Sequence, residues 1–191
     1  MGLLKLKEKI SVEDYLEGEK VSPVKHEYIS GEVYAMAGAS ANHNRISGNF
    51  FTPLHFHLRG SDCEAFMSDM KVMIDENTFY YPDVVVACDS TDTDPYVRTE
   101  PRLIIEVLWP STQRIDRHEK LSAYRRVNSL QEYVIVAQDR IRVELHRRVS
   151  DDDWETQIFN NADEHVQLSS VDLTLSVSDI YRNVRFEEAE S

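Results

Sequence analysis

The stretch "RLIIEVLWPSTQRIDRHEK" (Arg102–Lys120) joins a short apolar run to a polar segment of helical spacing. "RLIIEVL" has the pattern of a central strand covered on both faces. "DRHEKLSAYRRV" predicts a helix with Leu121 and Tyr124 facing inward. Glu106 interrupts the apolar run, and a buried carboxylate is stable only when it is paired, protonated or bound to a metal. The groups that share its site therefore matter for both fold and function.

The rest of the chain predicts an ordered series of short elements. Ser11 caps an expected helix in "SVEDYLEGEK", and Ser30-Gly31 lies at the turn of an expected hairpin in "KHEYISGEVYAMAG". Residues 40–58 repeat apolar side chains every four positions, which predicts a long amphipathic helix with Pro53 as a candidate kink. Four further stretches read as strands: "CEAFMSDMKVMID", "TFYYPDVVVACD", "EYVIVAQ" and "RIRVELHRRV".

The C-terminal part adds two predicted edge strands, "DDDWETQIFN" and "VQLSSVDLTLSV", and a closing helical turn in "SVSDIYRNV". No repeat, linker or low-complexity tract divides the chain. We therefore expect a single domain over residues 1–191, of the α/β or α+β class, with a mixed sheet and helices on its faces.

Composition narrows the function classes. The net charge is −13, from 34 acidic and 21 basic residues, which disfavours a protein that coats nucleic acid. Basic side chains nevertheless gather in residues 114–126 and 140–148, so a local basic face remains compatible with the sequence. Cys63 and Cys88 match no metal-ligand spacing and are too few for a disulfide scaffold, so we expect reduced thiols. "MGLLKLKEKI" has no signal-peptide pattern, and no segment is long enough to span a membrane, so we expect a cytoplasmic location.

Two carboxylates occupy unusual positions on predicted strands. Asp83 follows Pro82 at the start of "VVVA", and Glu106 lies within "LIIEVL". On neighbouring strands, about 4.8 Å apart, both stay ionised only if a cation lies between them, and Mg²⁺ or Mn²⁺ suits such oxygen ligands. Each of these residues, and Lys120, also has a structural explanation. Asp83 can form an Asx turn, Glu106 can face solvent or pair with an arginine, and Lys120 can be an exposed helix residue that pairs with Asp116.

The combination resembles a known group of enzymes. A Pro-Asp followed by a glutamate on a strand looks like the PD-(D/E)XK nuclease superfamily. More closely, "YPDVVVACD" and "PRLIIEVLWPSTQRIDRHEKLSAYRRVNSLQEYVIV" resemble the Uma-two family of restriction endonucleases, and "HEYISGEVYAMAGASANHNRI" is similar to that family's opening. The resemblance covers residues 11–148, leaving C-terminal strands and a tail at 149–191. It implies a restriction-endonuclease-like mixed central β-sheet flanked by helices, with an N-terminal hairpin and a long helix.

The resemblance also implies roles for individual residues. Asp83 and Glu106 would bind Mg²⁺ or Mn²⁺, with the Val107 carbonyl as a third ligand. Lys120 would orient the attacking water or stabilise the charge on the phosphorane, and Glu27 would reach the metal directly or through water. These residues therefore form the catalytic set that the resemblance implies, and it implies no other cofactor.

Two positions depart from the family pattern. Leu108 occupies the place of the superfamily's usual lysine, a role that the resemblance transfers to Lys120, and Trp109 replaces the family's usual serine. Weaker candidates for the second shell or the substrate contact are Glu32, His43, Asp116 (as a support for Lys120), Ser111 and Thr112 (as helix caps or phosphate contacts).

The function implied by the resemblance is hydrolysis of DNA phosphodiester bonds by a metal-dependent endonuclease of a restriction or mobile-element system, leaving a 5′-phosphate. One alternative is a catalytically inactive nuclease fold that binds nucleic acid or protein. Another is a small-molecule phosphodiesterase, which the lack of a Gly-rich phosphate loop disfavours. Half-site symmetry on DNA favours a homodimer, although the sequence shows no dimer seam.

Overall fold

The structure, a computed structural model, describes residues 9–36, 38–89, 91–108 and 113–186, with side chains described from residue 119 onward in the last range. The helices within these ranges are α1 (Val12–Glu19), α2 (Ala41–His57), α3 (Gln113–Arg125), α4 (Val177–Ile180) and the 3-10 turn η1 (Ser169–Val171). The strands are β1 (His26–Ile29), β2 (Glu32–Ala35), β3 (Glu64–Met67), β4 (Lys71–Asp75), β5 (Thr78–Tyr80), β6 (Val84–Ala87), β7 (Val97–Arg98), β8 (Pro101–Leu108), β9 (Glu132–Ala137), β10 (Val143–Arg148), β11 (Trp154–Phe159), β12 (His165–Leu168) and β13 (Leu173–Ser176). No helix in the described ranges is long and apolar enough to cross a membrane.

The two N-terminal helices begin where the sequence predicts. The Ser11 hydroxyl accepts a hydrogen bond from the Asp14 amide at 3.1 Å, and the Ser40 hydroxyl accepts one from the His43 amide at 3.0 Å. Helix α2 continues through Pro53. Its four-residue apolar repeat is buried, since Ile46, Phe50 and Leu54 are fully inaccessible to solvent. The predicted amphipathic helix is confirmed.

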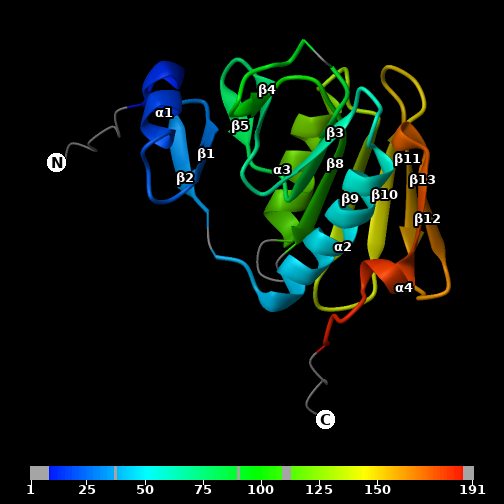
Figure 1. Cartoon of the computed structure of the whole chain (residues 1–191). Coiled ribbons are helices and arrows are strands. Elements are labelled where there is room, and N and C mark those ends of the chain that lie inside the picture. The colour runs from blue at the N-terminus through cyan, green and yellow to red at the C-terminus, as the bar shows by residue number, and fades with distance from the viewer. Residues whose placement is uncertain (1–8, 37, 90, 109–112, 187–191) are drawn as a thin grey trace.

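A five-stranded sheet, in the order β2-β1-β5-β4-β7, carries the predicted hairpin. Ser30 and Gly31 connect β1 and β2 with positive φ angles of 50° and 94°, as a two-residue hairpin turn requires. One face of this sheet packs against α1 through Tyr15, Tyr28 and Phe79. Figure 1 shows α1, β1 and β2 on the opposite side of the molecule from β12 and β13.

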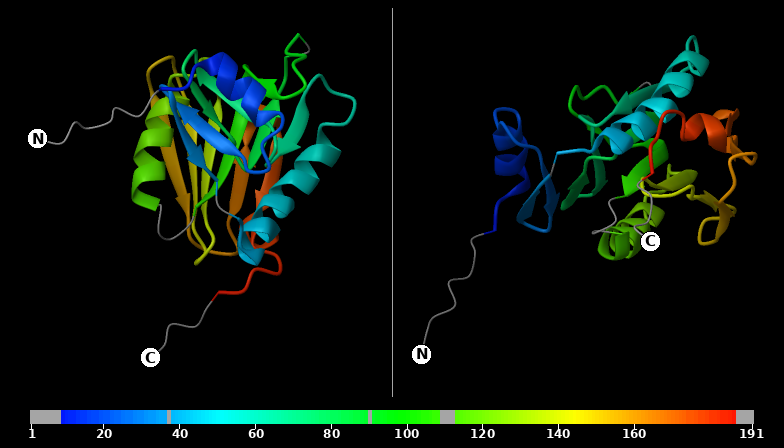
Figure 2. Two further views of the ribbon diagram at one scale, coloured as in Figure 1. Left: turned by 90° about the vertical axis from the view of Figure 1, so that its left-hand side faces the viewer. Right: turned by 90° about the horizontal axis from the view of Figure 1, so that it is seen from below.

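A six-stranded sheet, in the order β11-β10-β9-β8-β6-β3, forms the body of the protein. Strands β8 and β9 are parallel and completely or almost completely buried, which confirms "RLIIEVL" and "EYVIVAQ" as central strands. Side chains of alternate β8 residues enter two cores: Leu103 and Ile105 lie on the α2 side, and Ile104 and Leu108 lie on the α3 side. Figure 2 shows α2 and α3 on opposite sides of these strands.

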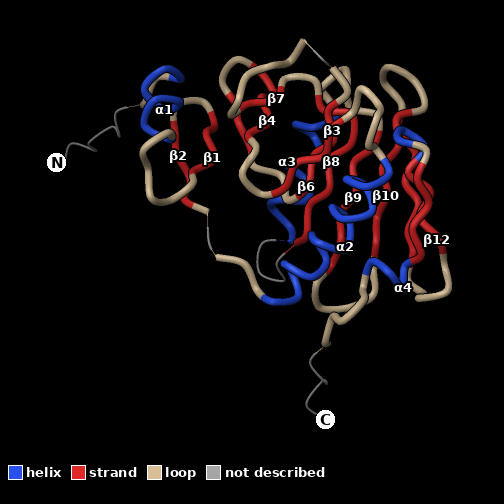
Figure 3. The backbone as a smooth tube through the Cα atoms, in the orientation of Figure 1, coloured by secondary structure: helices blue, strands red, loops and turns tan. Residues whose placement is uncertain are grey.

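The strands divide more finely than the single mixed sheet that the sequence predicts. Between β5 and β6, the chain passes from the five-stranded to the six-stranded sheet at residues 81–83, where Pro82 cannot donate to a strand ladder. Strand β11 is an edge strand as predicted, whereas β12 and β13, among the strands of the described ranges, pair only with each other. Figure 3 shows the strands of the body together and the β1–β2 hairpin apart from them. The predicted class, a mixed sheet with helices on its faces, is confirmed.

The expectation of reduced thiols is wrong, because Cys63 and Cys88 form a disulfide. The antiparallel pairing of β3 and β6 places Glu64 opposite Ala87. The cysteines are the next residues outward on each strand, so the ladder brings them together, with their Cα atoms 3.9 Å apart. This pairing depends on strand register, which the spacing of two cysteines in the sequence cannot reveal.

Candidate active site

Asp83 and Glu106 lie side by side, as predicted. The β6–β8 ladder pairs Val84 with Ile105, so Asp83, one residue before β6, stands opposite Glu106. Residues directly opposite in an antiparallel pair project from the same face of the sheet. Both side chains belong to residues that are largely buried, with 9% of Asp83 and 6% of Glu106 exposed. Two carboxylates therefore share one poorly solvated position on the α3 face.

Lys120 reaches this position from α3. Its ammonium nitrogen lies 3.2 Å from Glu106 Oε1 and 2.8 Å from Glu27 Oε1. Glu27 comes from β1, and its Oε1 also accepts a hydrogen bond from the Tyr81 amide at 3.4 Å. The lysine thus joins a carboxylate of the five-stranded sheet to one of the six-stranded sheet. This contact draws the two sheets together around one cluster of charges.

Asp83 is held from two further elements. Its Oδ2 accepts a hydrogen bond from the Val107 amide at 2.7 Å, and its Oδ1 lies 3.1 Å from Nε2 of His43 on α2. The position of His43 follows from the cap at Ser40, which sets the start of α2. The candidate histidine of the sequence is therefore in contact with Asp83. Val107, predicted as a carbonyl ligand, contributes its amide to Asp83.

Tyr124 also belongs to this cluster, although it is not among the site residues that the sequence predicts. It is fully buried, and its hydroxyl donates to Glu106 Oε1 at 2.9 Å. A signal for it exists in the sequence, because residues four apart lie on the same face of a helix and Tyr124 follows Lys120 by that spacing. The sequence marked Tyr124 only as an inward-facing apolar position.

The remaining candidates lie elsewhere. Glu32 is exposed on β2, and its Oε2 accepts a hydrogen bond from the Tyr34 hydroxyl at 2.7 Å. Trp109, Ser111 and Thr112, together with the Asp116 side chain, lie outside the described residues. The described contacts of the Lys120 ammonium group are with Glu27 and Glu106, and its expected pairing with Asp116 lies outside the described residues.

Burial and like charges shape the protonation of the cluster. Burial raises the pKa of Glu106 from 4.5 to about 7; Lys120 opposes this rise, while Asp83 and Glu27 add to it. Burial acts to lower the pKa of Lys120, but Glu106 and Glu27 outweigh it and hold the pKa well above its ordinary value. Burial acts to lower the pKa of His43 as well, but the hydrogen bond to Asp83 and the charge of Asp83 outweigh it, so the pKa of His43 is raised overall. The site as a whole therefore favours additional positive charge.

The oxygen atoms of this site fit a hard divalent cation. Among the described residues, no group of three or more Asp, Glu, His or Cys side chains is arranged to hold a metal ion by itself. Mg²⁺, however, typically takes only one or two carboxylates and completes its shell with water and substrate. Asp83 and Glu106 supply two carboxylates on one face of the sheet. Burial raises the pKa of Glu106 most, and the charges of Asp83 and Glu27 add to the rise, so a cation at this position would favour its ionised form.

The mixed sheet, with Asp83 before one strand and Glu106 on the neighbouring strand, agrees with the restriction-endonuclease-like arrangement that the sequence resemblance implies. The family model for Uma2, described as "Putative restriction endonuclease", matches residues 12–178, and the chain belongs to this family. Two proteins of Synechocystis sp. (strain ATCC 27184 / PCC 6803 / Kazusa) are similar along most of their length. "Uncharacterized protein slr1290" is 40% identical over 182 residues, covering 93% of this chain and 94% of that protein. "Uncharacterized protein sll1609" is 38% identical over 149 residues, covering 76% and 84%.

A solved structure has the same fold. It is described as "a putative nuclease belonging to DUF820" from Anabaena variabilis ATCC 29413, and it superposes with a TM-score of 0.72. The match covers 90% of this chain and 97% of that one at 18% sequence identity. At this level of identity the likeness concerns the fold, and it agrees with the predicted fold class.

Proposed function

We propose that this protein is a Mg²⁺- or Mn²⁺-dependent endonuclease that hydrolyses phosphodiester bonds in DNA. The observation that carries the proposal is the placement of Asp83 opposite Glu106, with Lys120 in contact with Glu106. Membership of the Uma2 family supports the same reaction class. A divalent cation would supply the positive charge that lets a phosphodiester approach the carboxylates of Asp83, Glu106 and Glu27.

Asp83 and Glu106 would hold the cation, with the Val107 carbonyl as a further ligand. The N–H and C=O of one strand residue point to the same edge of the strand, and the Val107 N–H points to Asp83. The Val107 carbonyl therefore points to the side of β8 on which Asp83 lies, where it would serve as a third oxygen ligand of the cation. His43 would fix the orientation of Asp83, and Tyr124 would fix that of Glu106, through the hydrogen bonds described above.

Lys120 would act on the reacting phosphate. When water attacks phosphorus and the P–O3′ bond breaks, negative charge grows on the non-bridging oxygens and on the leaving oxygen, which takes up a proton. An ammonium group whose pKa is held above its ordinary value remains charged throughout and can donate hydrogen bonds to those oxygens. Glu27 would position Lys120, because it accepts the shorter of the two described hydrogen bonds of the Lys120 ammonium group, at 2.8 Å against 3.2 Å for Glu106.

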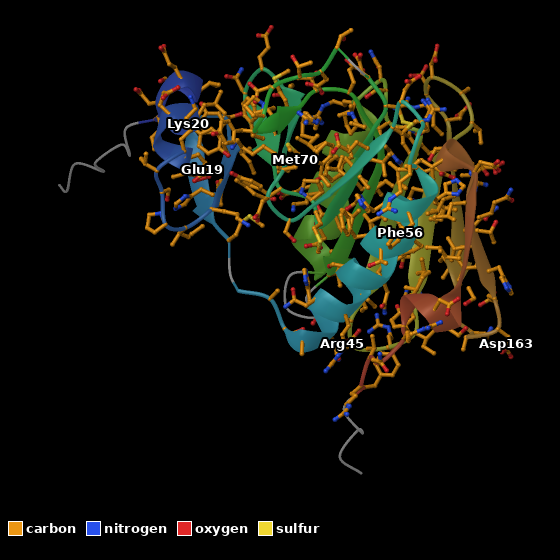
Figure 4. The ribbon with its side chains drawn as sticks, in the orientation of Figure 1. Glu19, Lys20, Arg45, Phe56, Met70 and Asp163 are labelled. Carbon is orange, nitrogen blue, oxygen red and sulfur yellow. A yellow bond between two sulfur atoms is a disulfide. The ribbon has the colours of Figure 1, made fainter. Side chains whose placement is uncertain are left out.

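Plasmid nicking tests the proposal. Cleavage should require Mg²⁺ or Mn²⁺, stop in EDTA and disappear in Asp83→Ala. Asp163→Ala is the matched control, because Asp163 is exposed and lies at the far end of the molecule near the C-terminal strands (Figure 4). Equal cleavage by the wild type in EDTA, or full activity of Asp83→Ala beside Asp163→Ala, would show that the chemistry lies elsewhere.

The second candidate is a nuclease fold that binds nucleic acid or protein without turnover. The net charge of −13 favours it, because an acidic molecule attracts a polyanion weakly. It predicts DNA or protein binding with no metal-dependent cleavage in the same assay. Binding that persists when nicking is absent in both metals would favour this candidate over the enzyme.

A further inference from the structure

The face of the five-stranded sheet that carries Glu27 continues beyond the charged cluster. In β1, Ile29 is two residues from Glu27 and so projects from the same face. The ladders place Tyr34 opposite Glu27, Glu32 opposite Ile29 and Thr78 opposite Ile29. These side chains, from three neighbouring strands, therefore share one face. The opposite face is the one that packs against α1.

A cavity of about 820 Å³ lies between this face and α3. Ile29, Thr78 and Tyr80 line it from the sheet, and Glu119 and Ser122 line it from the helix. The cavity adjoins the charged cluster, because the Tyr80 ring lies 5.2 Å from the ammonium nitrogen of Lys120. The cavity also borders the cluster along α3, because Glu119, which lines the cavity, directly precedes Lys120. A molecule whose phosphate is held at Lys120 thus has an open space beside it.

The chemistry of the cavity suits the base of a nucleotide better than its phosphate. Asp75, Glu76 and Glu119 provide carboxylate acceptors, and Ile29 and Tyr80 provide apolar surface. Arg126 also lines the cavity, but it lies 3.5 Å from Asp75 and offsets only one of the three negative charges. Carboxylates repel phosphate but accept hydrogen bonds from the amino groups of cytosine and adenine. Its volume lies within the range of sites that enclose small organic groups.

Tyr34 adds an aromatic ring next to this space. The residue is 48% exposed, and its hydroxyl is held by Glu32 on the same strand face. The β1–β2 ladder puts Tyr34 on the same strand face as Ile29, which lines the cavity, because Tyr34 stands opposite Glu27 and Ile29 is two residues further along β1. An exposed aromatic ring beside a nucleic-acid site is a platform on which an unpaired base can stack.

We propose that the cavity between β1, β5 and α3 binds an unpaired nucleobase next to the scissile phosphate, with Tyr34 as its stacking partner. This inference rests on the proposed nuclease function and names its substrate class as DNA with unpaired bases. The base enters the cavity while its phosphate stays at Lys120. A fully paired duplex must first expose a base, so single-stranded or locally opened DNA binds better.

The test compares two short single-stranded oligonucleotides with the same phosphates. One carries all its bases, and in the other the central nucleotides are abasic tetrahydrofuran units. Fluorescence anisotropy in Ca²⁺ measures binding, and Mg²⁺ is added separately to measure cleavage. Ser122→Trp fills the cavity from an exposed position, Tyr34→Ala removes the ring, and Tyr34→Phe keeps it. Phe56→Ala is the control, since Phe56 is a 57% exposed aromatic on α2, away from the hairpin (Figure 4).

The wild type should bind the complete oligonucleotide about tenfold more tightly than the abasic one, the scale of stacking one base. Ser122→Trp and Tyr34→Ala should each reduce this ratio towards one, while Tyr34→Phe and Phe56→Ala keep it. A wild-type ratio of one, failure to bind either oligonucleotide, or an unchanged ratio in both Ser122→Trp and Tyr34→Ala overturns the inference. Base-dependent binding without cleavage would refute the proposed function and leave the nucleobase site standing. Cleavage without base-dependent binding would refute the nucleobase site and leave the proposed function standing.

Discussion

Replacing Glu106 by glutamine should stabilise the metal-free protein at high pH. Glutamine keeps the shape of the side chain and its acceptor for Tyr124, but it removes the charge that burial opposes. A carboxyl whose pKa is raised in the folded state binds a proton more tightly there than in the unfolded chain. Its contribution to stability is therefore present below pH 4.5 and is lost as the pH rises to about 7.

The magnitude follows from the size of that rise. A pKa raised from 4.5 to about 7 corresponds to roughly 3 kcal/mol, at about 1.4 kcal/mol for each unit of pKa. The free energy of unfolding of Glu106→Gln minus that of the wild type should be near zero at pH 4.5. It should approach about 3 kcal/mol in favour of the variant at pH 8.

Urea denaturation in EDTA measures the difference at each pH. Taking the difference between the two proteins cancels the titration of groups that do not interact with Glu106 and leaves that of Glu106 and the charges around it. Glu100→Gln serves as the control, because Glu100 is exposed. A difference that stays constant from pH 4.5 to pH 8, or that favours the wild type at pH 8, would refute the reasoning that burial dominates at Glu106.

Three other changes have defined outcomes. Lys120→Met should lower cleavage at least about a hundredfold and destabilise the protein by about 3 kcal/mol, because Glu27 and Glu106 lose their cation. Cleavage kinetics and urea melts measure these two effects. Unchanged values in both would contradict the assigned contacts. Tyr124→Phe should lower stability by about 1–2 kcal/mol and slow cleavage about tenfold through the lost hydrogen bond to Glu106, and a purely structural role would lower stability without slowing cleavage. Reducing the Cys63–Cys88 disulfide, whose cysteines are 25 residues apart, should lower the free energy of unfolding by about 3 kcal/mol. The stability of the control variant Cys63→Ser should not respond to reductant. Two titratable thiols in the untreated protein would contradict the pairing.

The local features of the fold were predictable because they depend on local physics. Ser11 and Ser40 cap helices where the sequence places them, and the α2 repeat is buried as its spacing predicts. The alignment of Asp83 with Glu106 was also accessible, because both lie at strand positions with few residues between them. Lys120 was found through the family resemblance rather than through spacing.

The features that escaped prediction depend on long-range arrangement. The division of the strands between two sheets and the pairing of Cys63 with Cys88 depend on strand pairing and register, which composition does not determine. Tyr124 was classified by its apolar ring, although its hydroxyl binds Glu106. Tyr34 belongs to the proposed nucleobase site only through strand register, because the β1–β2 ladder places it opposite Glu27.

Binding of Mn²⁺ to the intact protein tests the central claim most directly. Calorimetric titration of the wild type should show one site per chain, and Asp83→Asn and Glu106→Gln should each abolish the heat. At pH 6 the binding should also release a proton, because the pKa of Glu106 lies near 7 before the cation arrives. Equal heats for the wild type and both variants would contradict the assignment of Asp83 and Glu106 as a metal site.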